Sequence, residues 1–276
     1  ETGGRAKTAR ANQAISFAEA LLTFGAVFGV LIAFDVRPVV AAACAVVAIP
    51  ASPAVVMTVV KDLRAQGQVT ERLLLLTAAG SAYASVALAL LLGWVHVEVR
   101  QDFVAMLMHP VYLLGCSTVL ATIIGYGAVH LLRLAGRKPA IQFPLVVALV
   151  LASVALASML RLPVPLTLLL LGLFTRYFDR DRHFVSLRLG ETGTLFVVVL
   201  FALVGAELKL GDMVVAVAII AVRFVAKLAP MLIWARASAL SPRKSILTAA
   251  AMSPLSGLAV LMLADLIALD PALGAE

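Results

Sequence analysis

Charged residues are scarce in this chain of 276 amino acids. Asp, Glu, Lys and Arg together make up 13% of the sequence, whereas a soluble globular domain carries roughly 25%. Hydrophobic residues account for 63%, and the mean hydropathy is +1.07. Apolar runs of about 20 residues recur along the chain, and each is long enough to cross a bilayer. The composition excludes an ordinary soluble protein and predicts an all-α polytopic membrane protein.

Other signals are also missing. The two cysteines, Cys44 and Cys116, lie in apolar stretches and form no disulfide or metal-binding pattern. The polar start of the chain lacks the apolar core and cleavage site of a signal peptide. The sequence contains no nucleotide-binding loop and no nucleophile elbow, and its histidines lack metal-ligand spacing. We therefore expect no enzymatic activity, no cofactor and no bound structural metal.

Nine membrane spans can be read from the apolar runs. They cover about 14–34, 37–60, 70–93, 103–134, 143–160, 163–176, 191–206, 211–234 and 242–266. The fifth and sixth are short and are separated only by residues 161–163, so a single hairpin is the alternative interpretation. About nine transmembrane helices are predicted, in one transmembrane domain over residues 1–276.

The basic residues explain the net charge of +7 without a nucleic-acid partner. Lys and Arg concentrate in alternate loops, and the opposite set of loops receives only Arg37, Arg100, Arg161 and Lys209. Cytoplasmic loops of membrane proteins carry the excess of Lys and Arg. This pattern predicts an integral protein of the bacterial inner (plasma) membrane with a cytoplasmic N-terminus.

Two of the hydrophobic stretches are interrupted near their middles by proline, at residues 49–53 and 252–257. Proline inside a helix removes a backbone donor and clashes with the preceding turn. Broken helices survive in membranes only where protein or a water-filled cavity receives the freed backbone groups. A pair of interrupted helices in corresponding halves indicates the binding site of a transporter. An inverted repeat would need a partner helix after residue 266, so we expect the chain to be a fragment lacking terminal helices.

The interruptions supply oxygen atoms that suit a small dehydrated cation. The candidates are the side chains of Ser52, Ser253 and Ser256 and the backbone carbonyls freed by Pro53 and Pro254. The alternative is an ordinary proline kink, with the serines bonded back to the preceding turn.

Four ionisable residues in or beside apolar spans are candidates for charge compensation or proton coupling. Arg223 and Lys227 lie four residues apart in the eighth span, on one helix face. Charges at membrane depth mark a pathway or a partner by default, although snorkelling to the cytoplasmic surface is the alternative. Glu19 and Glu191 enter from the same side and are the expected counter-charges, with a simple interfacial position as the alternative.

Four segments resemble the monovalent cation:proton antiporter superfamily, which comprises the sodium/proton exchangers and their potassium-efflux relatives. They are residues 51–63, 201–208, 223–227 and 252–259. The resemblance implies an inverted-repeat fold with two crossed discontinuous helices, whose core elements would span 37–93 and 211–266. It also implies elevator-like alternating access, a homodimer in the lipid bilayer, and sodium or potassium exchanged for protons.

One departure from that family stands in the helix after the first interruption. The family carries there an acidic pair that binds cation and proton in turn, and this chain has Gly80 and Ser81 in the corresponding positions. A serine hydroxyl can coordinate a cation but cannot exchange a proton near neutral pH. Lys227 would also lose its usual partner. Proton coupling would then use Lys227 itself or a displaced carboxylate such as Glu19 or Glu191.

Three functions remain open from the sequence. The first is cation:proton antiport at a site between the two interruptions. The second is a proton-uncoupled or inactive regulatory paralogue, which the missing carboxylate suggests. The third is an inverted-repeat carrier for an organic anion, which basic residues without clear acidic partners would favour.

Overall fold

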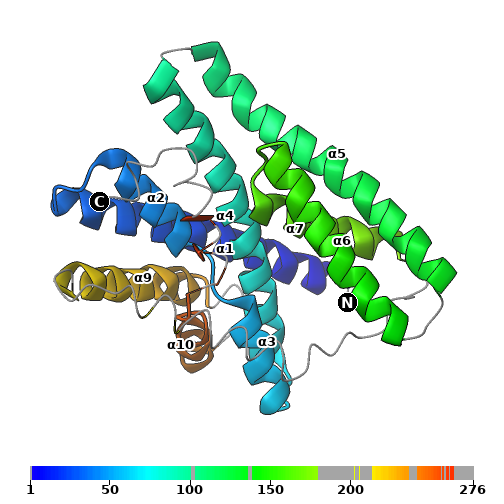
Figure 1. Ribbon diagram of the computed structural model, residues 1–276. Helices are drawn as coiled ribbons and strands as arrows, with labels where there is room; N and C mark the ends of the chain where they lie inside the picture. The colour runs from blue at the N-terminus through cyan, green and yellow to red at the C-terminus, as the bar shows by residue number, and fades with distance from the viewer. Residues whose placement is uncertain are drawn as a thin grey trace. The chain divides into compact units, whose positions relative to one another are not determined.

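The computed structural model describes residues 2–100, 103–135, 139–179, 213–235 and 241–255, with single residues at 202, 205, 257, 259, 260, 262 and 263. Regular secondary structure within these residues is helical (Figure 1). The helices are α1 (Thr2–Ala33), α2 (Pro38–Ala48), α3 (Pro53–Asp62), α4 (Gln68–Arg100), α5 (Phe103–Ala135), α6 (Pro139–Met159), α7 (Val164–Phe178), α9 (Met213–Ile233) and α10 (Pro242–Ala251).

Five of the described helices are long and apolar enough to cross a membrane. The crossing segments are Asn12–Ala33, Gln68–Trp94, Pro110–Leu134, Ile141–Met159 and Met213–Ile233. Two shorter apolar helices, α2 and α7, accompany them. The described residues are therefore consistent with the predicted all-helical polytopic membrane protein. The total of nine spans stays a prediction, because the expected span 191–206 lies almost wholly outside the described residues.

The first expected interruption separates α2 from α3. Helix α2 ends at Ala48, and α3 begins at Pro53. Proline is tolerated at the first position of a helix because the amide there makes no hydrogen bond within the helix. The Ser52 hydroxyl accepts a hydrogen bond from the Val55 amide at 3.3 Å and so caps α3. The chain thus stops one helix and starts another within four residues.

The second expected interruption follows α10, which ends at Ala251. Beyond it, Leu255 forms an isolated antiparallel bridge with Ala51 of the first interruption. The Ser52 amide donates to the Pro254 carbonyl at 3.0 Å. The two unwound segments, distant in sequence, are therefore joined through their backbones.

The fifth and sixth predicted spans are separate helices, α6 and α7, joined by a tight turn. Arg161 adopts a left-handed conformation with φ of 55°, and the Leu162 amide donates to the Ala157 carbonyl at 2.8 Å. This pattern ends a helix with a six-to-one hydrogen bond. Pro163 then serves as the N-cap of α7, so the connection is a helical hairpin.

Contacts divide the chain into two compact units. The first comprises residues 1–88 and 209–276, and the second comprises residues 89–208. In the first unit, α1 packs against both α2 and α9, and α10 packs against α9. In the second, α5, α6 and α7 pack against one another (Figure 1).

Two apolar clusters form the core of the first unit. One joins α1, α3, α4, α9 and α10 through Ile15, Val56, Leu73, Leu76, Met231 and Ala249 together with Ala51 and Met252. The other joins α1 and α2 through Val27, Leu31, Ala41, Ala45 and Ala48. Glu19 lies on α1 between the residues that contribute to the two clusters.

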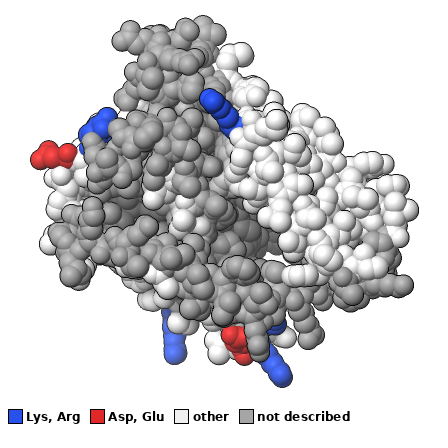
Figure 2. Space-filling view, in the orientation of Figure 1, with Lys and Arg blue, Asp and Glu red and all other residues white. Residues whose placement is uncertain are grey.

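Large hydrophobic side chains cover much of the described surface, as expected for helices that face lipid. Met159 is 84% exposed, and Ile123, Leu151 and Ile220 each expose more than half of their surface. Figure 2 shows that charged side chains are few on the described part of this face. Apolar exposure on this scale fits a bilayer and not water.

We predict that Gly125→Leu destabilises the packing of α5 against α7. A Cβ atom at position 125 would already lie 3.3 Å from the Thr175 amide nitrogen and 3.4 Å from the Phe174 Cβ. Overpacking of this kind costs about 1–3 kcal/mol. The midpoint of thermal unfolding in detergent should fall. Gly115→Leu on the same helix, where a Cβ meets nothing within 4 Å, is the matched control, and an equal fall in both variants would contradict the prediction.

Candidate functional site

A buried ion pair joins α1 to α9. The Lys227 ammonium donates a hydrogen bond to Glu19 Oε1, and both side chains are completely buried. The ammonium also donates to the Ile49 carbonyl at 2.8 Å. Breaking a pair of this kind leaves an uncompensated charge in a medium of low dielectric constant, which is strongly unfavourable. Glu19 is one of the two counter-charges expected from the sequence, and it pairs with Lys227 although the usual partner on α4 is missing.

Arg223 lies one turn before Lys227 on the same face of α9 and binds both interruptions. Its Nε donates to the Ala48 carbonyl at 2.7 Å, and one of its terminal nitrogens donates to the Pro50 carbonyl at 3.0 Å. The other terminal nitrogen donates to the Ser253 carbonyl. The rigid fork of a guanidinium suits several acceptors at once. Arg223 therefore links the first interruption to the second.

Backbone carbonyls at the interruptions are thus occupied by protein donors. Those of residues 48–50 and 253 receive Arg223 or Lys227, and that of Pro254 receives the Ser52 amide. A helix broken within a membrane must satisfy these groups internally. These hydrogen bonds join the two interruptions to each other and to α9.

The predicted serine ligands are also engaged. Ser52 caps α3, with Pro53 following as its first residue, and the Ser253 hydroxyl donates to the Ala249 carbonyl at 3.4 Å. Both hydroxyls therefore have local backbone partners. Ser256 and Glu191 lie outside the described residues.

Gly80 and Ser81 lie on the buried side of α4. The Ser81 hydroxyl donates to the Thr77 carbonyl at 3.0 Å, which is an ordinary bond to the preceding turn. A Cβ built on Gly80 would lie 4.0 Å from Glu19 Oε2. Gly80 therefore faces the carboxylate of Glu19, and the second oxygen of that carboxylate is directed to the position where the resembled family has its acidic pair.

Further buried polar atoms lie on α1 and α4. Glu19 Oε2 and the hydroxyls of Ser16, Thr23 and Thr77 have no hydrogen-bond partner among the described residues. Ser16 and Thr23 lie three residues before and four residues after Glu19, so the three share one face of α1. That spacing is visible in the sequence, and sequence reasoning missed it because it treated Glu19 alone.

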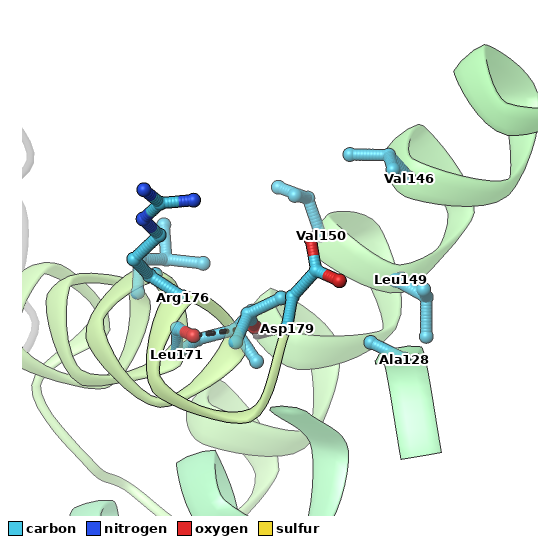
Figure 3. Close-up of a pocket in the computed structure, with 10 residues that line it drawn as sticks. Ala128, Val146, Leu149, Val150, Leu171, Arg176 and Asp179 are labelled. Atoms are coloured by element: carbon cyan, nitrogen blue, oxygen red, sulfur yellow. Dashed lines mark hydrogen bonds between the residues drawn. The ribbon is translucent and has the colours of Figure 1, made fainter. Parts of the chain in front are cut away.

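A pocket of about 410 Å³ lies in the second unit between α5, α6 and α7. Most of the residues that line it are apolar, among them Ala128, Leu149 and Leu171. Its two charged side chains, Arg176 and Asp179, point in different directions (Figure 3). None of the predicted site residues lines it. The pocket therefore lacks the convergent polar groups of an ion site.

The family model of the transmembrane sodium/hydrogen exchanger matches residues 7–274. The chain belongs to that family. No curated protein matches the sequence. The match covers both interruptions and the whole of the described site, and it makes this exchanger-family protein an integral membrane protein of a cation:proton antiport family.

Family membership also fixes the general nature of the ligands. The antiporter family implies cations and protons as the transported species. It is a family of transporters and not of enzymes.

We predict that Arg223→Lys destabilises the protein even though the positive charge is kept. An ammonium cannot reach three separated carbonyls, and each lost charge-assisted hydrogen bond costs about 1.5–3 kcal/mol. The thermal midpoint in detergent should fall markedly. Arg243→Lys is the control, because Arg243 is exposed on α10. A midpoint for Arg223→Lys equal to that of the control would contradict the bracing role of Arg223.

Proposed function

We propose that this chain exchanges a monovalent cation, sodium or potassium, for a proton by alternating access, with Glu19 and Lys227 as the exchange centre. The observation that carries this proposal is the completely buried Glu19–Lys227 pair beside the crossing of the two interrupted helices. Intramembrane ionisable residues that pair with each other mark ion and proton pathways. The crossed interruptions match the architecture that transporters place around a substrate.

The need to keep the buried net charge constant couples cation binding to proton release. Three charged groups meet here, namely Glu19, Lys227 and Arg223, and Arg223 keeps its positive charge throughout because a guanidinium stays protonated in proteins. A cation that binds the Glu19 carboxylate removes the counter-charge from the Lys227 ammonium. The ammonium then releases one proton to water, so the net charge of the site is the same before and after. One cation enters for each proton that leaves.

The alternatives from the sequence receive less support. The anion-carrier hypothesis relied on basic residues without acidic partners, whereas Lys227 binds a carboxylate and Arg223 binds three carbonyls. The inactive-paralogue hypothesis relied on the missing carboxylate of α4, and Glu19 supplies a carboxylate that faces Gly80. Both observations favour a functional exchange centre.

The remaining assignments follow the proposal. The first unit, with α1, α2, α9 and α10, would be the core that carries the ion, and it includes most of the expected core elements 37–93 and 211–266. The alternation of basic loops supports a cytoplasmic N-terminus in the bacterial inner membrane. A homodimer is expected from the resemblance.

We predict that Glu19→Gln abolishes cation-dependent proton movement. The amide keeps the size of the side chain but offers neither a charge for the cation nor a partner for the ammonium. The measurement uses proteoliposomes with an imposed pH gradient and a pH-sensitive dye, to which sodium or potassium is added. Wild-type protein should dissipate the gradient, and the variant should give the rate of empty liposomes.

Glu71→Gln is the matched control for this experiment, because Glu71 is exposed in the first turn of α4. It should exchange ions at the wild-type rate. Wild-type exchange by Glu19→Gln would refute the proposed centre. Proton movement that is independent of the cation, and unchanged in Lys227→Ala, would refute antiport.

A further inference from the structure

The pocket of about 410 Å³ between α5, α6 and α7 belongs to the second unit alone and takes no part in the proposed exchange centre. Its volume falls within the range of sites that bind small organic ligands, about 300–1,000 Å³. On α7 its lining extends from Leu168 to Asp179, a length of about 16 Å at 1.5 Å per residue. This length is about half of the roughly 30 Å hydrocarbon thickness of a bilayer. The pocket is therefore long enough for one acyl chain of one leaflet.

The pocket borders the lipid-facing surface of α6 and α7. Val150 and Gly172 line it, and the next residue in each helix, Leu151 or Leu173, is 64% or 59% exposed. A Cβ built on Gly172 would meet nothing within 4 Å, so the glycine leaves open space on the α7 side. The apolar lining and this open space suit an acyl chain that enters from the bilayer.

The end of α7 has the features of a membrane–water interface. Tyr126 of α5 and Tyr177 of α7 are 65% and 64% exposed, and each ring packs against Phe178 in an edge-to-face arrangement. Tyrosine is enriched at the level of the lipid head groups. Arg176, which lines the pocket, lies in the same last turn of α7. A lipid whose acyl chain lies along α7 would therefore have its head group beside Arg176.

The charges at this end favour a head group that carries both signs. Arg176 is positive and exposed, Asp179 is negative, and their side chains point in different directions (Figure 3). A guanidinium suits the oxygens of a phosphate. A carboxylate accepts up to about four hydrogen bonds, so Asp179 can receive an ammonium in addition to its contacts within the protein. A head group with a phosphate and an amine satisfies both residues, whereas a purely anionic one would bring a second negative charge to Asp179.

The burial of Asp179 selects the kind of amine. Asp179 is 2% exposed although it lines the pocket, so only a small donor can approach its carboxylate. A primary ammonium is compact and has three hydrogens to donate. A trimethylammonium is larger and has none. The geometry therefore favours ethanolamine over choline.

We propose that this pocket binds one phospholipid with a primary amine in its head group, namely phosphatidylethanolamine. One acyl chain lies between α6 and α7 beside Gly172, the phosphate accepts hydrogen bonds from Arg176, and the ammonium donates to Asp179. The lipid holds α6 against α7 at the end of the hairpin that is opposite the tight turn at residues 161–163. The proposal concerns the second unit only and does not depend on the exchange centre.

The test is lipid binding to the purified full chain in maltoside micelles. Phosphatidylethanolamine, phosphatidylcholine and phosphatidylglycerol with the same acyl chains are titrated, and bound lipid is counted by native mass spectrometry. One phosphatidylethanolamine should bind per chain, about tenfold more tightly than phosphatidylcholine, as expected for a hydrogen bond to a charged group. Equal affinity of these two lipids, or tighter binding of phosphatidylglycerol, would overturn the proposal.

Two variants assign the head-group contacts. Asp179→Asn should remove the preference for ethanolamine over choline, because an amide is a neutral and weaker acceptor for an ammonium. Arg176→Gln should weaken the binding of all three lipids about tenfold, since each has a phosphate. Arg161→Gln, at the exposed opposite end of the hairpin, is the matched control and should bind lipid as the wild type does. A folded variant of Asp179 or Arg176 that behaved like this control would overturn the corresponding contact.

Asp179 is nearly buried, so its variant can lose stability for reasons unrelated to lipid, and Gly172→Leu tests the pocket independently. The leucine side chain starts from open space and occupies the place of the acyl chain. This variant should lose the tightly bound lipid, and its thermal midpoint should no longer rise when phosphatidylethanolamine is added. Gly115→Leu, which is also open at its Cβ but lies outside the pocket lining, is the control. Tight lipid binding retained by Gly172→Leu would refute an acyl chain in this pocket.

Discussion

The need to satisfy backbone carbonyls away from water governs the centre of this protein. Two broken helices leave carbonyls at residues 48–50 and 253 without helical partners, and a bilayer offers no water to replace them. Two side chains of α9 meet that need, since Arg223 binds three of the carbonyls and Lys227 binds the fourth. Their four-residue spacing places both on the face of α9 that binds the two interruptions.

The two positive side chains, Arg223 and Lys227, in turn require a counter-charge, and Glu19 supplies it. Positive groups gathered in an apolar core are unfavourable unless an anion accompanies them. Glu19 satisfies Lys227 with one carboxylate oxygen and leaves the other directed to Gly80. One arrangement of charges thus has two consequences. The carbonyls of the broken helices receive hydrogen bonds, and one oxygen of the Glu19 carboxylate is left without a partner among the described residues.

The helix ends and the shared face of α9 could be predicted from the sequence, because both depend on residues close together in the chain. Proline at positions 53 and 254 predicts the ends of helices, and the spacing of Arg223 and Lys227 predicts a shared face. The sequence offered two candidate counter-charges, Glu19 and Glu191, and could not choose between them. Glu19 and Lys227 are 208 residues apart in sequence, and only the packing of α1 on α9 brings them together. Ser52 shows the same limit, since a hydroxyl before a proline-initiated helix can cap that helix or bind an ion, and here it caps α3.

The absence of an acid at Gly80 therefore has a different meaning once α1 is in place. A carboxylate on α4 would stand within contact distance of Glu19, and two like charges in one buried site disfavour each other. An exchanger needs one such charge beside the lysine, and it does not matter to the ion from which helix the carboxylate comes. With glycine at position 80, Glu19 faces α4 without a second charge beside it. In the exchange centre that we propose, the carboxylate of α1 would therefore take the part that an acid on α4 takes in the resembled family.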